Sequence, residues 1–200
     1  MKIWYLLRHF KALSDWERRG WSDHAPQFVK QAIFEKYAID GATWVETGTF
    51  MGRTTRFLAS LSPLVYTIEP APKLFKRAKR RFKNTHVHVL NGTSEDIIPA
   101  LLPKLNSDVC FWLDGHYSAG QTHRGPTDCP IEQELFAIAA NLDNFEKMSI
   151  LIDDIRLFVP SETTYTDYPT VDFLVDWARR YDFEWRIEQD IFVMRNWSEG

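Results

Sequence analysis

Cysteine is scarce in this chain. Its 200 residues include only Cys110 and Cys129, and two thiols 19 positions apart form neither a disulfide framework nor a zinc-binding pattern. Long apolar runs are also absent, so we expect no membrane partner. The first twenty residues lack the apolar core and the cleavage site of a signal peptide. These absences indicate a reduced, cytoplasmic setting.

An excess of either charge is missing as well. The chain has 24 Lys and Arg residues against 27 Asp and Glu residues, a formal net charge of -3. This balance gives no electrostatic reason to expect nucleic acid as a partner. A chain of 200 residues is long enough for one sizeable core, so we expect one domain over residues 1–200. The aromatic residues, 14% of the chain, could fill that core or line a pocket.

The first forty residues have a helical pattern, which is clearest in APQFVKQAIFEKYAI (25–39). Four apolar side chains share one stripe at helical spacing: Phe28, Ala32, Ile33 and Tyr37. We expect residues 1–40 to form a helical cap on a core of residues 42–200. The aromatic-rich first twenty residues could cover a site, mediate a homodimer or pack on the core.

Beyond residue 42, short apolar strands alternate with helical segments. The expected strands are residues 43–48, 64–69, 86–90, 108–114 and 148–153. The expected helices are residues 53–61, 71–83, 97–105, 130–141 and 170–181. Residues 183–188 and 190–196 flank Gln189-Asp190 as a hairpin. The pattern predicts an α/β fold: a Rossmann-like, doubly wound, mostly parallel seven-stranded sheet with a C-terminal antiparallel hairpin and an N-terminal helical extension.

Ligands bind to such sheets at the carboxyl ends of the strands, and VETGTFMGRTT (45–55) follows this rule at the first strand. Gly48 permits a backbone conformation closed to other residues, and Gly52 permits close approach of the next helix. The free N–H groups at the start of that helix could bind a carboxylate or phosphate. A purely structural turn would explain the two glycines about as well.

The ends of the second and third strands carry polar residues. Glu69 lies 21 residues beyond Gly48, and an acid about 20 residues after a glycine loop commonly binds a ribose. A surface acid is the alternative. NGTSED (91–96) could bind an adenine edge, whereas Thr93 or Ser94 could instead cap a helix.

DGHYSAGQTHRG (114–125) follows the fourth strand. Asp114 ends an apolar run, so its carboxylate needs a partner. His116 and His123 lie in a loop rich in small and polar residues, and a loop of this length in a compact domain is usually functional.

Asp153 and Asp154 follow the fifth strand, which we expect beside the strand of Asp114. Adjacent carboxylates repel each other unless a cation lies between them. Together the three acids make an oxygen-rich site for Mg²⁺. In the alternative, Asp153 or Asp154 pairs with Arg156 or Arg53 and no metal binds.

Taken in order, these motifs resemble those of the class I S-adenosylmethionine-dependent methyltransferases. The nearer resemblance is to the small metal-dependent catechol and macrocin O-methyltransferases, over roughly residues 42–155. VETGTFMGRTT is similar to their first motif, YTIEP (66–70) to the acidic end of the second strand, and NGTSEDIIPAL (91–101) to the adenine-side segment. FWLDGHY (111–117) and ILIDD (150–154) resemble the strands that carry the metal ligands.

The resemblance implies roles for individual residues. Glu46 and Gly48 would contact the methionine part of S-adenosyl-L-methionine, Glu69 its ribose, and Ser94 with Glu95 its adenine. The whole cofactor-binding set would be Glu46, Gly48, Thr49, Gly52, Thr54, Glu69, Thr93, Ser94, Glu95 and Asp114. The metal ligands would be Asp114, Asp153 and Asp154.

Two positions depart from the family pattern. Asp154 stands where Asn is frequent, and Tyr117 stands where the catechol enzymes carry a lysine base. His116 and His123 become the candidate bases, beside Asp114, because an imidazole titrates near neutral pH. Either histidine could instead bind substrate or support the loop.

The sequence therefore predicts an S-adenosylmethionine-dependent O-methyltransferase that acts on a hydroxyl of a small-molecule acceptor, such as a sugar, a hydroxy-acid or a natural product. One alternative is a nicotinamide-dependent oxidoreductase, although the middle glycine of G-x-G-x-x-G is missing. Another is a non-catalytic cofactor-binding module. The seven basic residues of KLFKRAKRRFK (73–83) are expected on the solvated side of a helix, with a phosphate-bearing partner as the alternative.

Overall fold

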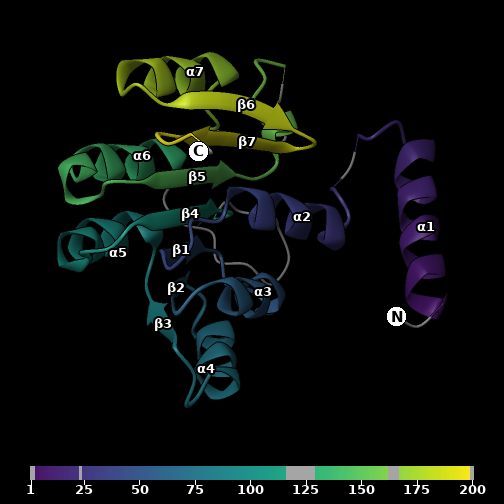
Figure 1. Cartoon of the computed structure of the whole chain (residues 1–200), viewed down its shortest axis with the longest axis horizontal. Coiled ribbons are helices and arrows are strands. Elements are labelled where there is room, and N and C mark those ends of the chain that lie inside the picture. Colours follow the sequence, from purple (N-terminus) through teal and green to yellow (C-terminus); the bar gives the residue numbers. More distant parts are fainter. Residues whose placement is uncertain (1–2, 23, 116–128, 162–166, 199–200) are drawn as a thin grey trace.

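Five parallel strands form most of one sheet. They are β1 (Thr43–Thr47), β2 (Leu64–Glu69), β3 (Val87–Asn91), β4 (Val109–Leu113) and β5 (Met148–Ile152). A hairpin of β6 (Glu184–Glu188) and β7 (Ile191–Arg195) completes it, with β7 antiparallel to both β5 and β6. The strand order is β3-β2-β1-β4-β5-β7-β6 (Figure 1). This computed structural model describes residues 3–22, 24–115, 129–161 and 167–198.

Helices cover both faces of the sheet. One face packs against α2 (Gln27–Tyr37), α3 (Arg53–Leu61) and α4 (Pro72–Arg81), and the other against α5 (Ser94–Leu101), α6 (Ile131–Ala139) and α7 (Val171–Arg180). Short 3₁₀ turns occupy Leu102–Lys104, Leu142–Asn144 and Ile155–Leu157. The doubly wound, mostly parallel sheet with its antiparallel C-terminal hairpin confirms the predicted fold class.

The central strands are buried on both sides, which explains their unbroken apolar sequences. Successive side chains of a strand point to opposite faces. In β4, Phe111 belongs to the core beneath α5–α7, and Trp112 belongs to the core beneath α2–α4. Both side chains are fully buried.

Helix α2 is fixed on the sheet by one aromatic side chain. Phe34 is fully buried, and its ring meets those of Trp112 and Trp44 edge-on, with centroids 4.6 and 6.0 Å away. The predicted stripe on this helix is only partly correct, because Ala32 is exposed. The buried residues of the helix are Lys30, Ile33, Phe34 and Tyr37.

The parallel register sets the strand ends at a common edge. Thr47 of β1 lies opposite both Ile68 of β2 and Leu113 of β4, and Leu113 lies opposite Ile152 of β5. Gly48, Glu69, Asp114 and Asp153 directly follow these four residues. We call this edge the rim.

Helix α5 begins at Ser94, three residues before the predicted start at residue 97. Glu95 and Asp96 occupy its first turn, where carboxylates favour the positive end of the helix dipole. The acids of NGTSED thus belong to the helix itself.

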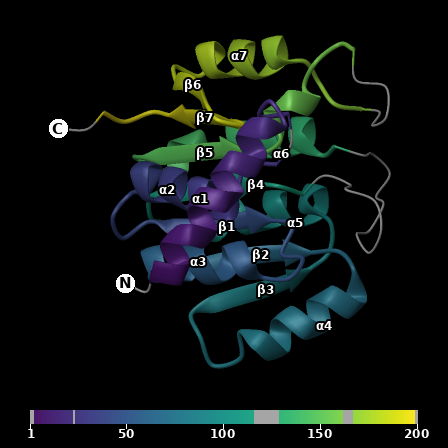
Figure 2. The same ribbon diagram turned by 90° about the vertical axis from the view of Figure 1, so that its right-hand side faces the viewer.

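Helix α1 (Ile3–Arg18) stands on the side toward which β4 and β5 point (Figure 1). Figure 2 shows it crossing in front of the sheet. The ring of His9 stacks on Phe28 of α2 at 4.0 Å, whereas Leu7 and Phe10 are exposed. No helix among the described residues is both long and apolar enough to cross a bilayer.

We predict that Phe34→Ala lowers the free energy of unfolding by about 3–5 kcal/mol, because it opens a cavity between two tryptophans. Phe10→Ala, at a side chain that is 70% exposed, should change it by less than about 0.5 kcal/mol. Urea titration followed by tryptophan fluorescence measures both values. Equal losses in the two variants would show that α2 is not anchored through Phe34.

Candidate functional site

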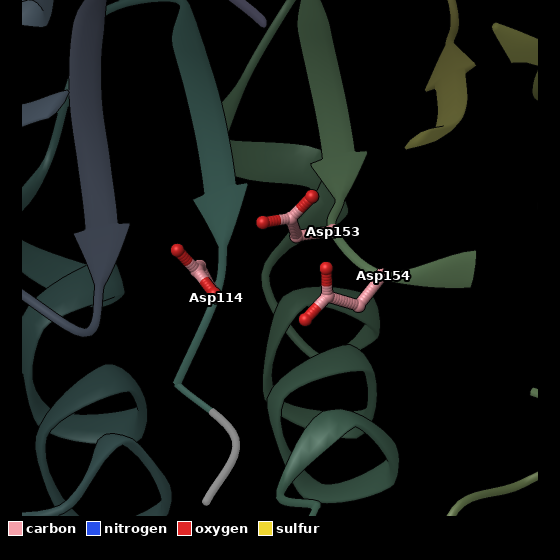
Figure 3. Close-up of side chains that lie close together, drawn as sticks. All are labelled: Asp114, Asp153 and Asp154. Carbon is pink, nitrogen blue, oxygen red and sulfur yellow. The ribbon is translucent and has the colours of Figure 1, made fainter. Parts of the chain in front are cut away.

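The three acids predicted as metal ligands come together at the rim (Figure 3). Asp114 follows β4, and Asp153 and Asp154 follow β5. One carboxylate oxygen from each lies within 4.8 Å of the other two. Asp153 and Asp154 are buried and Asp114 is half-buried. The neighbouring strands β4 and β5 explain this meeting, as the sequence predicted.

A lysine that the sequence analysis did not single out enters this cluster. Lys30 of α2 forms an ion pair with Asp153, and its ammonium lies 5.5 Å from the ring centre of Trp112. Burial lowers the pKa of Lys30, but the negative charges of Asp153, Asp114 and Asp154 outweigh burial and raise the pKa above its ordinary value. Lys30 is therefore a buried, charged ammonium.

Asp154 has cationic partners of its own. Arg156 donates a hydrogen bond of 2.8 Å to Asp154 and also pairs with Asp190. His24 Nδ1 lies 3.2 Å from the same Asp154 oxygen, and this hydrogen bond raises the pKa of His24 despite partial burial. The predicted alternative, an aspartate paired with Arg156, is thus present in the structure.

The glycine loop lies directly against the rim. Gly48 has φ +85°, and a Cβ atom at this position would lie 2.3 Å from the carbonyl oxygen of Asp114. Gly48 must therefore be glycine both for its conformation and for its neighbour. Gly52 also has a positive φ, but a Cβ there would meet the ring of Phe82 at 2.9 Å, so this glycine makes room for the end of α4.

Glu46 supports the glycine loop through hydrogen bonds. It is fully buried, and its Oε2 accepts hydrogen bonds from Thr55 at 2.5 Å and Thr67 at 2.6 Å. Thr49 is bonded in turn to Thr67 at 2.6 Å. Oε1 of Glu46 has no hydrogen-bond partner within the described part of the chain. Burial, and to a smaller extent the charges of Asp114 and Glu69, raise the pKa of Glu46 to about 8.

Glu69 joins the ends of β1 and β2. Its two oxygens accept hydrogen bonds from the backbone N–H groups of Phe50 at 2.8 Å and Ala71 at 2.9 Å. The side chain is buried, so the predicted surface-acid alternative is wrong. Glu69 braces the loop that contains Gly48.

The remaining predicted cofactor residues lie around the same edge. Thr54 accepts a hydrogen bond from Gln27 of α2 at 3.3 Å. Thr93 stands at the N-cap of α5, but its hydroxyl donates to the Asp96 carboxylate and accepts no hydrogen bond from a backbone N–H of the helix. The Ser94 hydroxyl is 3.3 Å from the Glu95 carboxylate.

The candidate bases His116 and His123 lie outside the described residues, as does Tyr117. Three charged residues at the rim were missed from sequence: His24, Lys30 and Asp190. The position of Lys30 could have been predicted, because it lies three residues before Ile33 and four before Phe34. This spacing places it on the buried stripe of α2.

We predict that Gly48→Ala costs about 3 kcal/mol or more of stability, because the new methyl group would overlap backbone. Gly41 is a matched control with φ +73°, and a Cβ atom there would have no other atom within 4 Å. Gly41→Ala should cost only about 1–2 kcal/mol. Chemical denaturation compares the two, and similar losses would contradict the contact with Asp114.

The raised pKa of Glu46 predicts a pH dependence. The folded protein holds this proton up to about pH 8, whereas the unfolded chain releases it near pH 4.5. Stability should therefore fall as the pH rises between these values, by an amount on the order of several kcal/mol. Glu46→Gln should flatten that slope, and Glu35→Gln, an exposed acid on α2, should not. Urea titrations at pH 5.5 and 8.5 measure the slopes, and an unchanged slope in Glu46→Gln would rule out Glu46 as its source.

Comparison with known proteins supports the fold. No protein-family model and no curated protein matches the chain. A proposed S-adenosylmethionine-dependent methyltransferase from Listeria monocytogenes is similar with a TM-score of 0.55 and 12% identity, over 86% of this chain and 100% of that one. A proposed caffeoyl-CoA O-methyltransferase from Staphylococcus aureus is similar with a TM-score of 0.53 and 13% identity. The likeness covers 98% of this chain and 92% of that one.

A proposed rRNA methylase from Clostridium thermocellum gives a TM-score of 0.52 and 12% identity, over 83% of this chain and 93% of that one. At such low identity a likeness speaks for the fold alone. This chain therefore has the Rossmann-like α/β fold found in class I S-adenosylmethionine-dependent methyltransferases.

Proposed function

We propose that this protein is an S-adenosylmethionine-dependent methyltransferase that acts on a hydroxyl of a small polar molecule. The observation that carries the proposal is the rim itself. A tight glycine turn after β1 touches Asp114 after β4, and a buried acid, Glu69, lies at the end of β2 on the other side of β1. This is the edge at which sheets of this kind bind nucleosides.

The rim offers a distinct contact for each part of the cofactor. Glu69 would accept hydrogen bonds from the ribose, since each oxygen of a carboxylate can accept more than one hydrogen bond. Ser94 and Glu95 would meet the adenine. Gly48 would let the methionine part approach the backbone, and Oε1 of Glu46, which has no hydrogen-bond partner within the described residues, would accept a hydrogen bond from its ammonium group.

The bound cofactor supplies an electrophilic methyl group on a sulfonium. The protein's part is to hold the acceptor oxygen in line with that carbon, and such alignment can contribute several kcal/mol. Asp114 contacts the glycine loop and would lie between the cofactor and the acceptor. The acceptor hydroxyl must also lose its proton, and His116 and His123 remain the proposed bases because both lie in the segment of the sequence that follows β4.

A divalent ion does not fit the acid cluster as it stands. The oxygen atoms would suit Mg²⁺, but Asp153 is paired with Lys30 and Asp154 with Arg156. We therefore place no step of the reaction on a metal ion.

RNA is the second candidate acceptor. One of the similar structures is described as an rRNA methylase, and α4 carries exposed basic residues such as Lys76, Lys79 and Arg80. These lie on the helix that covers β2 and β3, whereas the acids gather at β4 and β5. Negative charge at the reacting edge disfavours phosphates, so we favour a small polar acceptor.

We predict that S-adenosylhomocysteine binds and that NAD does not. Glu69→Gln should weaken the binding of S-adenosylhomocysteine roughly tenfold, about 1.4 kcal/mol, because the ribose loses a charged acceptor. Glu184→Gln, in the edge strand β6, should bind like the wild type. Isothermal titration calorimetry measures each, with circular dichroism as the test of folding. NAD binding without S-adenosylhomocysteine binding would favour the oxidoreductase alternative.

A further inference from the structure

We propose that Lys30 is the resident cation of the rim and that this protein therefore needs no divalent ion there. The inference deepens the proposed function, on which it rests. It assigns the charge-balancing role of a metal ion to a side chain of the N-terminal segment.

The position of the ammonium supports this role. Lys30 bonds directly to Asp153, and the charges of Asp114 and Asp154 act on the same ammonium. These are the same three acids whose oxygens converge within 4.8 Å. An ammonium offers three N–H donors on a compact charge, so one lysine can serve several carboxylates at once.

Ion pairs already hold the two buried acids of the cluster, Asp153 and Asp154. Among the described residues, the carboxylates of Asp114, Asp153 and Asp154 gather here, and Arg156 joins Asp190 to them. Lys30 pairs with Asp153, and Arg156 pairs with both Asp154 and Asp190. A Mg²⁺ ion on Asp153 would have to displace the ammonium of Lys30 and leave it buried without its partner, which is strongly unfavourable.

The backbone holds Lys30 in place. It shares the buried face of α2 with Ile33, Phe34 and Tyr37, and Phe34 is wedged against Trp112. The ammonium of Lys30 lies over the ring of the same tryptophan. Such a cation–π contact stabilises the charge in a buried setting. Lys30 is therefore a positioning residue that fixes Asp153 and, through it, the acidic edge beside the proposed acceptor.

Mn²⁺ is the probe for this inference, because its electron paramagnetic resonance signal separates free from bound ion without any enzymatic turnover. The wild-type protein should not bind Mn²⁺ at millimolar concentration. Lys30→Gln should gain Mn²⁺ binding, because the three acids lose their ammonium. Lys30→Arg, which keeps the positive charge, should remain without it, and Lys30→Gln combined with Asp153→Asn should lose the gained site.

If Lys30→Gln does not fold, Lys30→Met is the second variant to test. It removes the positive charge and keeps a long apolar side chain. Mn²⁺ binding by the wild-type protein would overturn the inference, whatever the variants do. Absence of binding in both the wild type and the folded Lys30 variants would also overturn it, since Lys30 would then not be what keeps the ion out. Calorimetry with S-adenosylhomocysteine on the same samples tests the proposed function separately.

Discussion

The buried ion pair between Lys30 and Asp153 ties the N-terminal segment to the carboxyl edge of the sheet. The two residues are 123 positions apart in sequence, and each is buried. A charge buried without its partner is costly, so the loss of either residue should destabilise the folded protein. Helix α2 consequently supplies a charged side chain to the rim.

The acids of the rim support the backbone as well as any ligand. Glu46 holds the glycine loop through Thr55 and Thr67, and Glu69 holds it through the N–H of Phe50. Gly48 can then touch Asp114 closely because the loop is fixed from two sides. The folded chain thus fixes the orientation of both Glu46 and Glu69.

Much of the fold could be predicted from the sequence because the strands are short, apolar and separated by helical patterns. The convergence of Asp114 with Asp153 and Asp154 followed from parallel topology alone. The start of α5 was harder to predict, since its polar first turn is equally typical of a loop. The spacing of apolar residues in α2 wrongly places Ala32 on the buried stripe. The fit of Phe34 between two tryptophans decides which face of the helix is buried.

The ionic partners of the rim could not be derived in the same way. The contacts of Lys30 with Asp153 and of His24 with Asp154 join residues more than a hundred positions apart. No local pattern records such a pair, because it depends on how a helix docks on a sheet. Only the presence of a lysine on a buried helix face indicates that an acid lies opposite.

The C-terminal hairpin has a consequence for the order in which the rim is assembled. Asp190, in the turn between β6 and β7, accepts the backbone N–H of Arg156, 34 residues earlier in sequence. As the chain leaves the ribosome, β5 can pair with β4 while Arg156 still lacks this partner. Until β7 arrives, β5 is also an unprotected edge strand, open to pairing with other chains. The nascent protein therefore passes through a stage in which its acidic edge is incomplete and its sheet is prone to association.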